Sequence, residues 1–155
     1  MFKFTDYDAI IGIDTGTHTG VAICVKTETG RNMRLTTLPI HKAIKLVADE
    51  SRKHQSTIVR FEDARKRKWF GANAYAKQQG AGSVKRDAVI WEDFLKDLKK
   101  ECAREGRILD FEAVAPKDNL TKMSPQYFNS IFGIDAKTSE HSRDAAGLVL
   151  RTGVI

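Results

Sequence analysis

The sequence contains only two cysteines, Cys24 and Cys102, which lie far apart and belong to no CxxC or Cys/His pattern. A disulfide framework and a cysteine-based zinc site are therefore not expected, and we predict reduced thiols that are buried or half-buried. No stretch approaches the roughly twenty apolar residues of a membrane-spanning helix. The N-terminus also lacks the basic-then-apolar pattern of a signal peptide. These absences predict a cytoplasmic protein without a membrane partner.

Internal repeats, low-complexity tracts and linkers are also absent from the sequence. Its 155 residues are enough for one domain with a substantial core and leave no room for a second domain of normal size. We therefore expect a single domain over residues 1–155.

Positive charge is in excess, with a net charge of +6 and an isoelectric point near 9.4. The excess is concentrated in residues 65–86, which hold seven basic residues and no acidic one. Such a patch can follow nucleic-acid phosphates, while aromatic side chains within it stack on unpaired bases or wedge between them. The alternative is that Trp69 and Phe70 begin a helix that packs into the core. The predicted DNA-binding residues are Arg65, Lys66, Arg67, Lys68, Trp69, Phe70, Tyr75, Lys77, Lys85 and Arg86.

Apolar periodicity and turn residues predict a mixed α/β protein. Residues 10–14 and 21–25 read as a hairpin punctuated by Gly16 and Gly20, and a strand–helix–strand unit then places the fourth strand parallel to the first. Residues 69–79 have some helical character before Gly80 interrupts it. The predicted strands cover residues 10–14, 21–25, 33–38, 56–63 and 107–115, and the predicted helices cover 40–53, 87–104, 126–131 and 141–150, the last capped by Ser139.

Carboxylates recur where the predicted elements end. Asp14 ends the first strand, Glu62 and Asp63 end the fourth, and Asp144 lies in the last helix, one turn after His141. Parallel pairing of the first and fourth strands would bring carboxylates side by side, where they repel one another unless divalent cations bind. Oxygen ligands with few soft donors suit Mg²⁺ or Mn²⁺. Two such ions about 4 Å apart can hold the attacking and leaving oxygens of a phosphodiester.

Each of these residues has a simpler alternative. Asp14 can cap its own turn, and Glu62 and Asp63 can be solvated charges, of which only one points toward a given face. Asp144 can be an exposed helix residue, and His141 a structural or exposed histidine. Taken together, carboxylates at the ends of adjacent elements in a basic protein favour a metal-dependent nuclease.

Three blocks, "IGIDTGTHTGVAI", "VRFEDAR" and "HSRDAAGLVL", resemble in order and spacing the RuvC family of Holliday junction resolvases, within the ribonuclease H-like superfamily. The resemblance covers the chain from end to end and is greatest to phage-type members, because the middle departs from bacterial RuvC. It implies a five-stranded mixed sheet of order 3-2-1-4-5, with the first three strands antiparallel and helices flanking it. A bacterial cell or a phage-infected host is the implied setting.

By this resemblance, Asp14, Glu62 and Asp144 are ligands of two Mg²⁺ ions, for which Mn²⁺ can substitute, and His141 ligates or orients the nucleophile. The segment "VAPKDNLTKMSPQYFNSIFG" resembles the part of the family in which lysines contact or activate the scissile phosphate, so Lys117 and Lys122 are candidates. Solvated surface lysines are the alternative. The implied activity is a crossover junction endodeoxyribonuclease, in which two sites of a homodimer nick opposing strands of a four-way DNA junction.

Three other functions are alternatives to this one. An actin- or Hsp70-like ATPase has a similar first strand and turn, but it needs two such domains and a second phosphate loop, so no nucleotide cofactor is expected. A nuclease for other branched DNA or for RNA–DNA hybrids would keep the metal site and change the substrate. A non-catalytic protein that binds branched DNA would keep only the basic surface.

Overall fold

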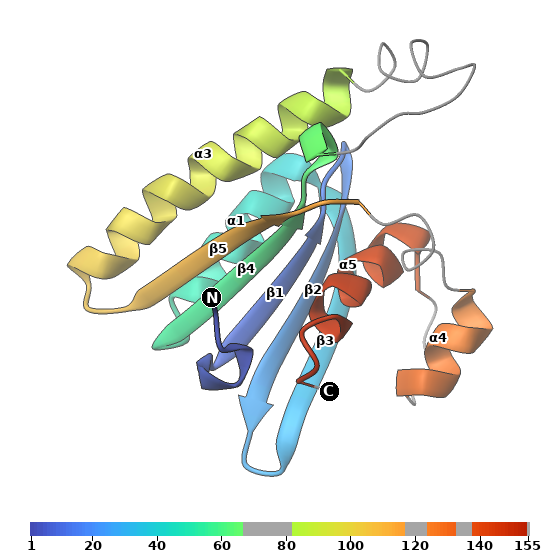
Figure 1. Cartoon of the computed structure of the whole chain (residues 1–155), viewed down its shortest axis with the longest axis horizontal. Helices are drawn as coiled ribbons and strands as arrows, with labels where there is room; N and C mark the ends of the chain where they lie inside the picture. Colours follow the sequence, from blue (N-terminus) through green and yellow to red (C-terminus); the bar gives the residue numbers. More distant parts are fainter. Residues whose placement is uncertain (67–81, 117–123, 133–137, 155) are drawn as a thin grey trace.

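A computed structural model describes residues 1–66, 82–116, 124–132 and 138–154 (Figure 1). The predicted helical stretch over 69–79 therefore lies outside the described residues. The strands are β1 (Ala9–Asp14), β2 (His18–Thr27), β3 (Gly30–Pro39), β4 (Ser56–Glu62) and β5 (Ile108–Val114). The helices are α1 (Ile40–Ser51), α3 (Gly82–Arg104), α4 (Pro125–Phe132) and α5 (Glu140–Leu150), and the short 3-10 turns are η1 (Phe4–Asp6) and η2 (Ala64–Lys66).

The strands form one mixed sheet of order β3-β2-β1-β4-β5. β1, β2 and β3 pair antiparallel, whereas β4 pairs parallel with both β1 and β5. The predicted strand order and directions are confirmed. The parallel register of β1 and β4 aligns Ile13 with Phe61, so the next residues, Asp14 and Glu62, end neighbouring strands at the same edge of the sheet.

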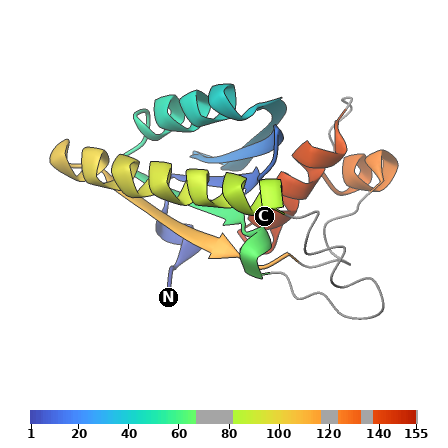
Figure 2. The ribbon, with the colours of Figure 1, turned by 90° about the horizontal axis from the view of Figure 1, so that it is seen from above.

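Two apolar clusters cover the two faces of the sheet. On one face, α1 and α3 pack on the odd-numbered residues of β1, such as Ile11 and Ile13, and these helices run alongside each other in Figure 2. On the other face, α5 packs on even-numbered residues such as Ile10. The stripe that includes Trp91 is buried on the first face, as predicted.

Both cysteine thiols are free and buried, as predicted. Cys24 belongs to the cluster under α5 and Cys102 to the cluster under α1 and α3, so the sheet separates them.

Element boundaries differ from the predictions mainly where polar residues extend an element. α3 begins at Gly82 rather than near Asp87, because its first turn carries exposed residues that no apolar periodicity marks. β2 and β3 are each ten residues long, since backbone pairing continues past their apolar centres. The cap predicted at Ser139 is confirmed, because its side chain accepts a hydrogen bond from the Ser142 amide.

Among the helices in the described ranges, none is both long enough and apolar enough to cross a lipid bilayer.

Candidate active site

Asp14 and Glu62 end adjacent parallel strands on the face that α5 covers. Strand side chains alternate between faces, and Ile13 and Phe61 belong to the opposite cluster, which assigns Asp14 and Glu62 to the α5 side. The hydroxyl of Thr15 donates a hydrogen bond to the main-chain oxygen of Glu62 at 2.9 Å. This bond ties the turn after β1 to the end of β4 and fixes the spacing of the two carboxylate-bearing positions.

Two glycines let α5 lie directly on the sheet. A Cβ atom on Gly20 would overlap the main-chain carbonyl of His141, and one on Gly12 would overlap that of Ala145. Helix backbone therefore meets strand backbone with no side chain between them. Since Gly20 also pairs with Asp14 across β1 and β2, the contact places the first turn of α5 beside Asp14.

The start of α5 is held by hydroxyl groups as well. Ser139 and Ser142 form a reciprocal capping box at the helix N-terminus. The Ser139 hydroxyl also shares a short hydrogen bond with the hydroxyl of Thr37, the partner of Gly20 on β3. These bonds fix the direction in which α5 leaves the sheet, and with it the position of the residues in its first turn.

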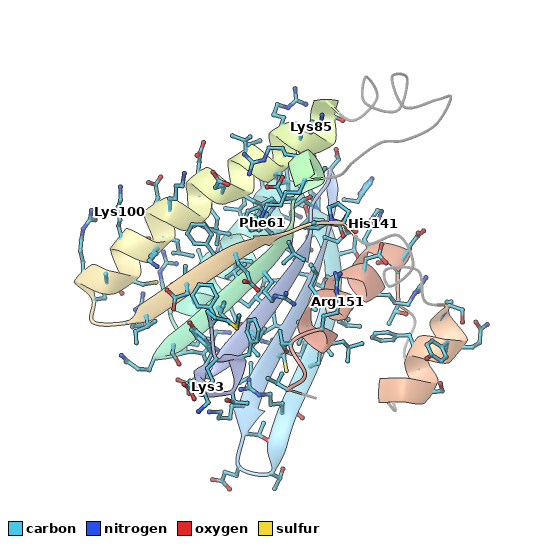
Figure 3. The ribbon with its side chains drawn as sticks, in the orientation of Figure 1. Lys3, Phe61, Lys85, Lys100, His141 and Arg151 are labelled. Atoms are coloured by element: carbon cyan, nitrogen blue, oxygen red, sulfur yellow. The ribbon has the colours of Figure 1, made fainter. Side chains whose placement is uncertain are left out.

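His141 and Asp14 are in direct contact. The Nδ1 atom of His141 lies 2.9 Å from Oδ2 of Asp14, with side-chain exposures of 49% and 13%, respectively. Figure 3 labels His141 at the end of α5 that meets this edge of the sheet. Burial and the nearby charge of Glu140 raise the pKa of Asp14, while the contact with His141 opposes the rise. Ionisation of the Asp14 carboxyl therefore costs free energy, and the contact with His141 offsets only part of that cost.

Asp144 lies one turn further along α5, and the pKa of its carboxyl is also raised. Burial, followed by the charges of Asp14, Glu140 and Glu62, raises the pKa of Asp144 to about 7. Its Oδ1 atom is buried and has no hydrogen-bond partner among the described residues. The predicted residues Asp14, Glu62, His141 and Asp144 are therefore brought together.

The raised pKa makes the stability of the metal-free protein depend on pH. Between about pH 4 and pH 7 the folded state binds more protons at Asp144 than the unfolded state, so the free energy of unfolding falls as pH rises through this window. In EDTA, we expect Asp144→Asn to match the wild type near pH 4 and to be more stable at pH 8. Because Asp144 is half-buried, screening limits the gain to about 1–2 kcal/mol, or roughly 2–8 °C in Tm.

Thermal unfolding at both pH values measures this difference. The matched control is Asp97→Asn, on the exposed side of α3, which should follow the wild type at both pH values. A gain for Asp144→Asn that is the same at pH 4 and pH 8 would contradict the assignment.

The donor set fits a divalent cation. Burial and the charges of Asp14 and Glu62 raise the pKa of Asp144, so a nearby positive ion would stabilise its ionised form, and the buried Oδ1 of Asp144, which has no hydrogen-bond partner among the described residues, could serve as a ligand. Within the described ranges, no three His, Cys, Asp or Glu side chains are arranged as a ready-made metal site. Binding of an ion would therefore require these side chains to turn toward it.

Asp63 lies apart from this group. Burial of Asp63 favours its neutral form, but hydrogen bonds from Arg65 outweigh that effect and hold the pKa of the carboxyl below its usual range. The Arg65 guanidinium contacts both Asp63 oxygens at 2.8 Å and reaches Glu92 on α3 at 2.7 Å. Of the two acidic residues at the end of β4, Glu62 is the one that acts on Asp144.

The predicted DNA-binding residues are only partly described. Arg65 is engaged with Asp63 and Glu92, and the Lys66 ammonium donates to the main-chain oxygen of Ala113 at 2.9 Å. Lys85 and Arg86 lie in the first turns of α3, and Figure 3 places Lys85 toward the same end of the molecule as His141. The remaining candidates lie outside the described residues: Arg67, Lys68, Trp69, Phe70, Tyr75 and Lys77, and the lysines Lys117 and Lys122.

One side chain at the site was not predicted. His18, the first residue of β2, is exposed, and its ring lies 6.5 Å from that of His141 between centroids, at an interplanar angle of 29°. The available signal was a histidine inside the turn of "DTGTHTG", next to the predicted aspartate. The neighbouring glycine and threonines are typical turn residues, so the pattern does not distinguish this histidine from the rest of the turn.

In comparisons with known proteins, no family model matches the chain, and no curated protein matches it with a significant score.

Proposed function

We propose that this chain is a divalent-metal-dependent endodeoxyribonuclease with a ribonuclease H-like fold, which nicks four-way DNA junctions. One observation carries the proposal. Acidic side chains from two adjacent parallel strands and from α5 meet at one edge of the sheet, where the buried Oδ1 of Asp144 has no partner among the described residues. Structural carboxylates are usually paired with a cation or exposed to water, so an unpaired buried group suits a site that binds a cation.

In this proposal each residue has a stated task. Asp14, Glu62 and Asp144 would hold two Mg²⁺ ions, for which Mn²⁺ can substitute, and Asp14 would contribute to both. When bound, the ions activate a water molecule and stabilise the charge that develops on the scissile phosphate. His141, whose Nδ1 is fixed against Asp14, uses its other ring nitrogen to ligate an ion or to orient the attacking water.

The proposed substrate follows from charge and from the resemblance described above. The net charge of +6 favours a polyanion. Lys85 and Arg86 lie in the first turns of α3, and Figure 3 places Lys85 toward the same end of the molecule as His141. Symmetric nicking of a junction requires two sites, so a second copy of the chain is the proposed partner.

Strand cleavage tests this proposal directly. A labelled four-way junction is compared with a linear duplex, a flap and an RNA–DNA hybrid, in Mg²⁺ and in EDTA. The expected result is a pair of symmetric nicks near the crossover, leaving 5′-phosphate and 3′-hydroxyl ends, which disappear in EDTA.

Other outcomes would overturn the proposal in different ways. Cleavage mainly of flaps or hybrids would keep the metal site and replace the substrate. Tight junction binding without cleavage in either Mg²⁺ or Mn²⁺ would leave a protein that binds branched DNA and has no nuclease activity.

A further inference from the structure

A second imidazole, that of His18, lies at the edge of the candidate site. Residues two apart on a strand have side chains on the same face of the sheet. On β2, the side chain of His18 is therefore on the same face as Ala22, which is the face that α5 covers. Its ring is inclined by 29° to the ring of His141, with centroids 6.5 Å apart. Unlike His141, it makes no hydrogen bond to Asp14 or to any other residue in the part of the chain that the structure describes.

The backbone that carries His18 is firmly held. The hydroxyl of Thr19, a buried residue, donates to the main-chain oxygen of Gly16 at 2.7 Å, and Thr15 is bonded to the end of β4 at 2.9 Å. His18 itself pairs with Pro39 at the end of β3. This support fixes the position of the His18 backbone relative to Asp14 without help from a ligand.

The chemistry of the site indicates what this imidazole would contact. A DNA strand that enters the site brings phosphates toward Asp14, Glu62 and Asp144, which repel them. N–H donors around the carboxylates offset this repulsion, and the Nδ1 of His141 is already directed at Asp14. His18 has ring nitrogens that are exposed and not engaged by described residues, so it can donate to a phosphate oxygen in either protonation state.

We propose that His18 is a substrate-binding residue that donates a hydrogen bond to a backbone phosphate next to the scissile one. This inference rests on the proposed nuclease function. It makes His18 a contact to DNA and not a metal ligand, and it assigns the turn between β1 and β2 to holding the strand that is cut.

The test compares steady-state cleavage of a four-way junction in Mg²⁺ by the wild type, His18→Ala, His18→Gln and His41→Ala. Loss of one hydrogen bond to a charged group predicts an increase in KM of about 10-fold or more for His18→Ala, with kcat changed by less than about 3-fold. His18→Gln keeps an N–H donor and should recover most of the loss. His41 is an exposed histidine of α1, and its replacement should have no effect.

Two further measurements separate a phosphate contact from other roles. A junction with an uncharged methylphosphonate beside the scissile phosphate should raise KM for the wild type and have little further effect on His18→Ala. Mn²⁺ affinity, measured by electron paramagnetic resonance without DNA, should be the same in His18→Ala and the wild type. A loss of Mn²⁺ affinity would make His18 a metal ligand and overturn the inference.

Failure of this inference differs from failure of the proposed function. If the wild type cleaves junctions and His18→Ala has an unchanged KM, the contact is wrong and the nuclease stands. If the wild type cleaves no junction in Mg²⁺ or Mn²⁺, the nuclease is wrong and the contact falls with it.

Discussion

Replacing Asp14 with Asn is expected to lower metal-dependent junction cleavage by at least about 1000-fold, equivalent to roughly 4 kcal/mol of transition-state stabilisation. In the proposed site Asp14 would contribute to the binding of both ions, so its loss would weaken both. Asn keeps the shape of the side chain and an oxygen that can accept a hydrogen bond from Nδ1 of His141, but it lacks the charge that attracts a cation. Cleavage rates in Mg²⁺ and in Mn²⁺ measure the effect.

Loss of folding would not explain this result. Asp14 is only 13% exposed, and burial together with the charge of Glu140 disfavours its ionised form. In EDTA at pH 8, Asp14→Asn should therefore unfold at a Tm no lower than that of the wild type. The matched control is Asp49→Asn, on the far side of the sheet, where Asp49 is exposed and pairs with Lys45 at 2.6 Å. If Asp14→Asn cleaved junctions at a rate within 10-fold of the wild type, Asp14 would not be part of the active site.

Gly20→Ala is expected to have the largest effect on stability. The new Cβ would overlap the main-chain carbonyl of His141, and neither backbone can move without disturbing the pairing of β2 or the packing of α5. Overpacking of this kind costs about 1–3 kcal/mol, which lowers the Tm of a chain of this size by roughly 2–12 °C. Cleavage should also fall about 100-fold, since displacement of catalytic groups by about 1 Å has effects of that size.

The control for this substitution is Gly16→Ala, in the turn that precedes β2. A Cβ on Gly16 would meet its nearest neighbour, the His18 carbonyl oxygen, at 3.5 Å, which is ordinary contact. We expect its Tm to stay close to that of the wild type. If Gly20→Ala were as stable as Gly16→Ala, α5 would not rest on the sheet as described.

The juxtaposition of Asp14 and Glu62 could be predicted because it depends on local patterns and one topological rule. A hairpin followed by a strand–helix–strand unit places the fourth strand parallel to the first, and the carboxyl ends of parallel neighbours meet at one edge. Alternation along β4 also separates Glu62 from Asp63. The structure agrees on both points.

The close approach of α5 was beyond such reasoning. The sequence pattern predicts that Gly20 is a turn residue. It lies instead inside β2, opposite a helix that follows it by more than a hundred residues. Nothing local in the sequence distinguishes a glycine required by a turn from one required by a neighbouring backbone. His18 was missed for the same reason, since its contact is with His141 and not with its own turn.

Ion pairs between residues far apart in the sequence could not be predicted from the sequence pattern either. The sequence pattern predicts that Arg65 belongs to a basic surface, but its partner Glu92 lies 27 residues away on α3. Glu50 fits the polar pattern of α1, yet it is 2% exposed, because Arg34 from β3 reaches it at 2.8 Å. Charge patterns predict which residues are polar, whereas tertiary packing decides which of them face solvent.

Paramagnetic broadening by Mn²⁺ in the amide NMR spectrum of the metal-free protein tests whether the carboxylates of the candidate site bind a metal ion, because it locates a bound ion without any assumption about substrate. We expect the amide signals of Asp14, Glu62 and Asp144 to broaden first, at Mn²⁺ levels that leave Thr27 and Asn32, at the other end of the sheet, unaffected. We also expect Asp14→Asn to abolish this selective broadening. Broadening centred elsewhere, or none at this edge of the sheet, would contradict the assignment of these carboxylates as a metal site.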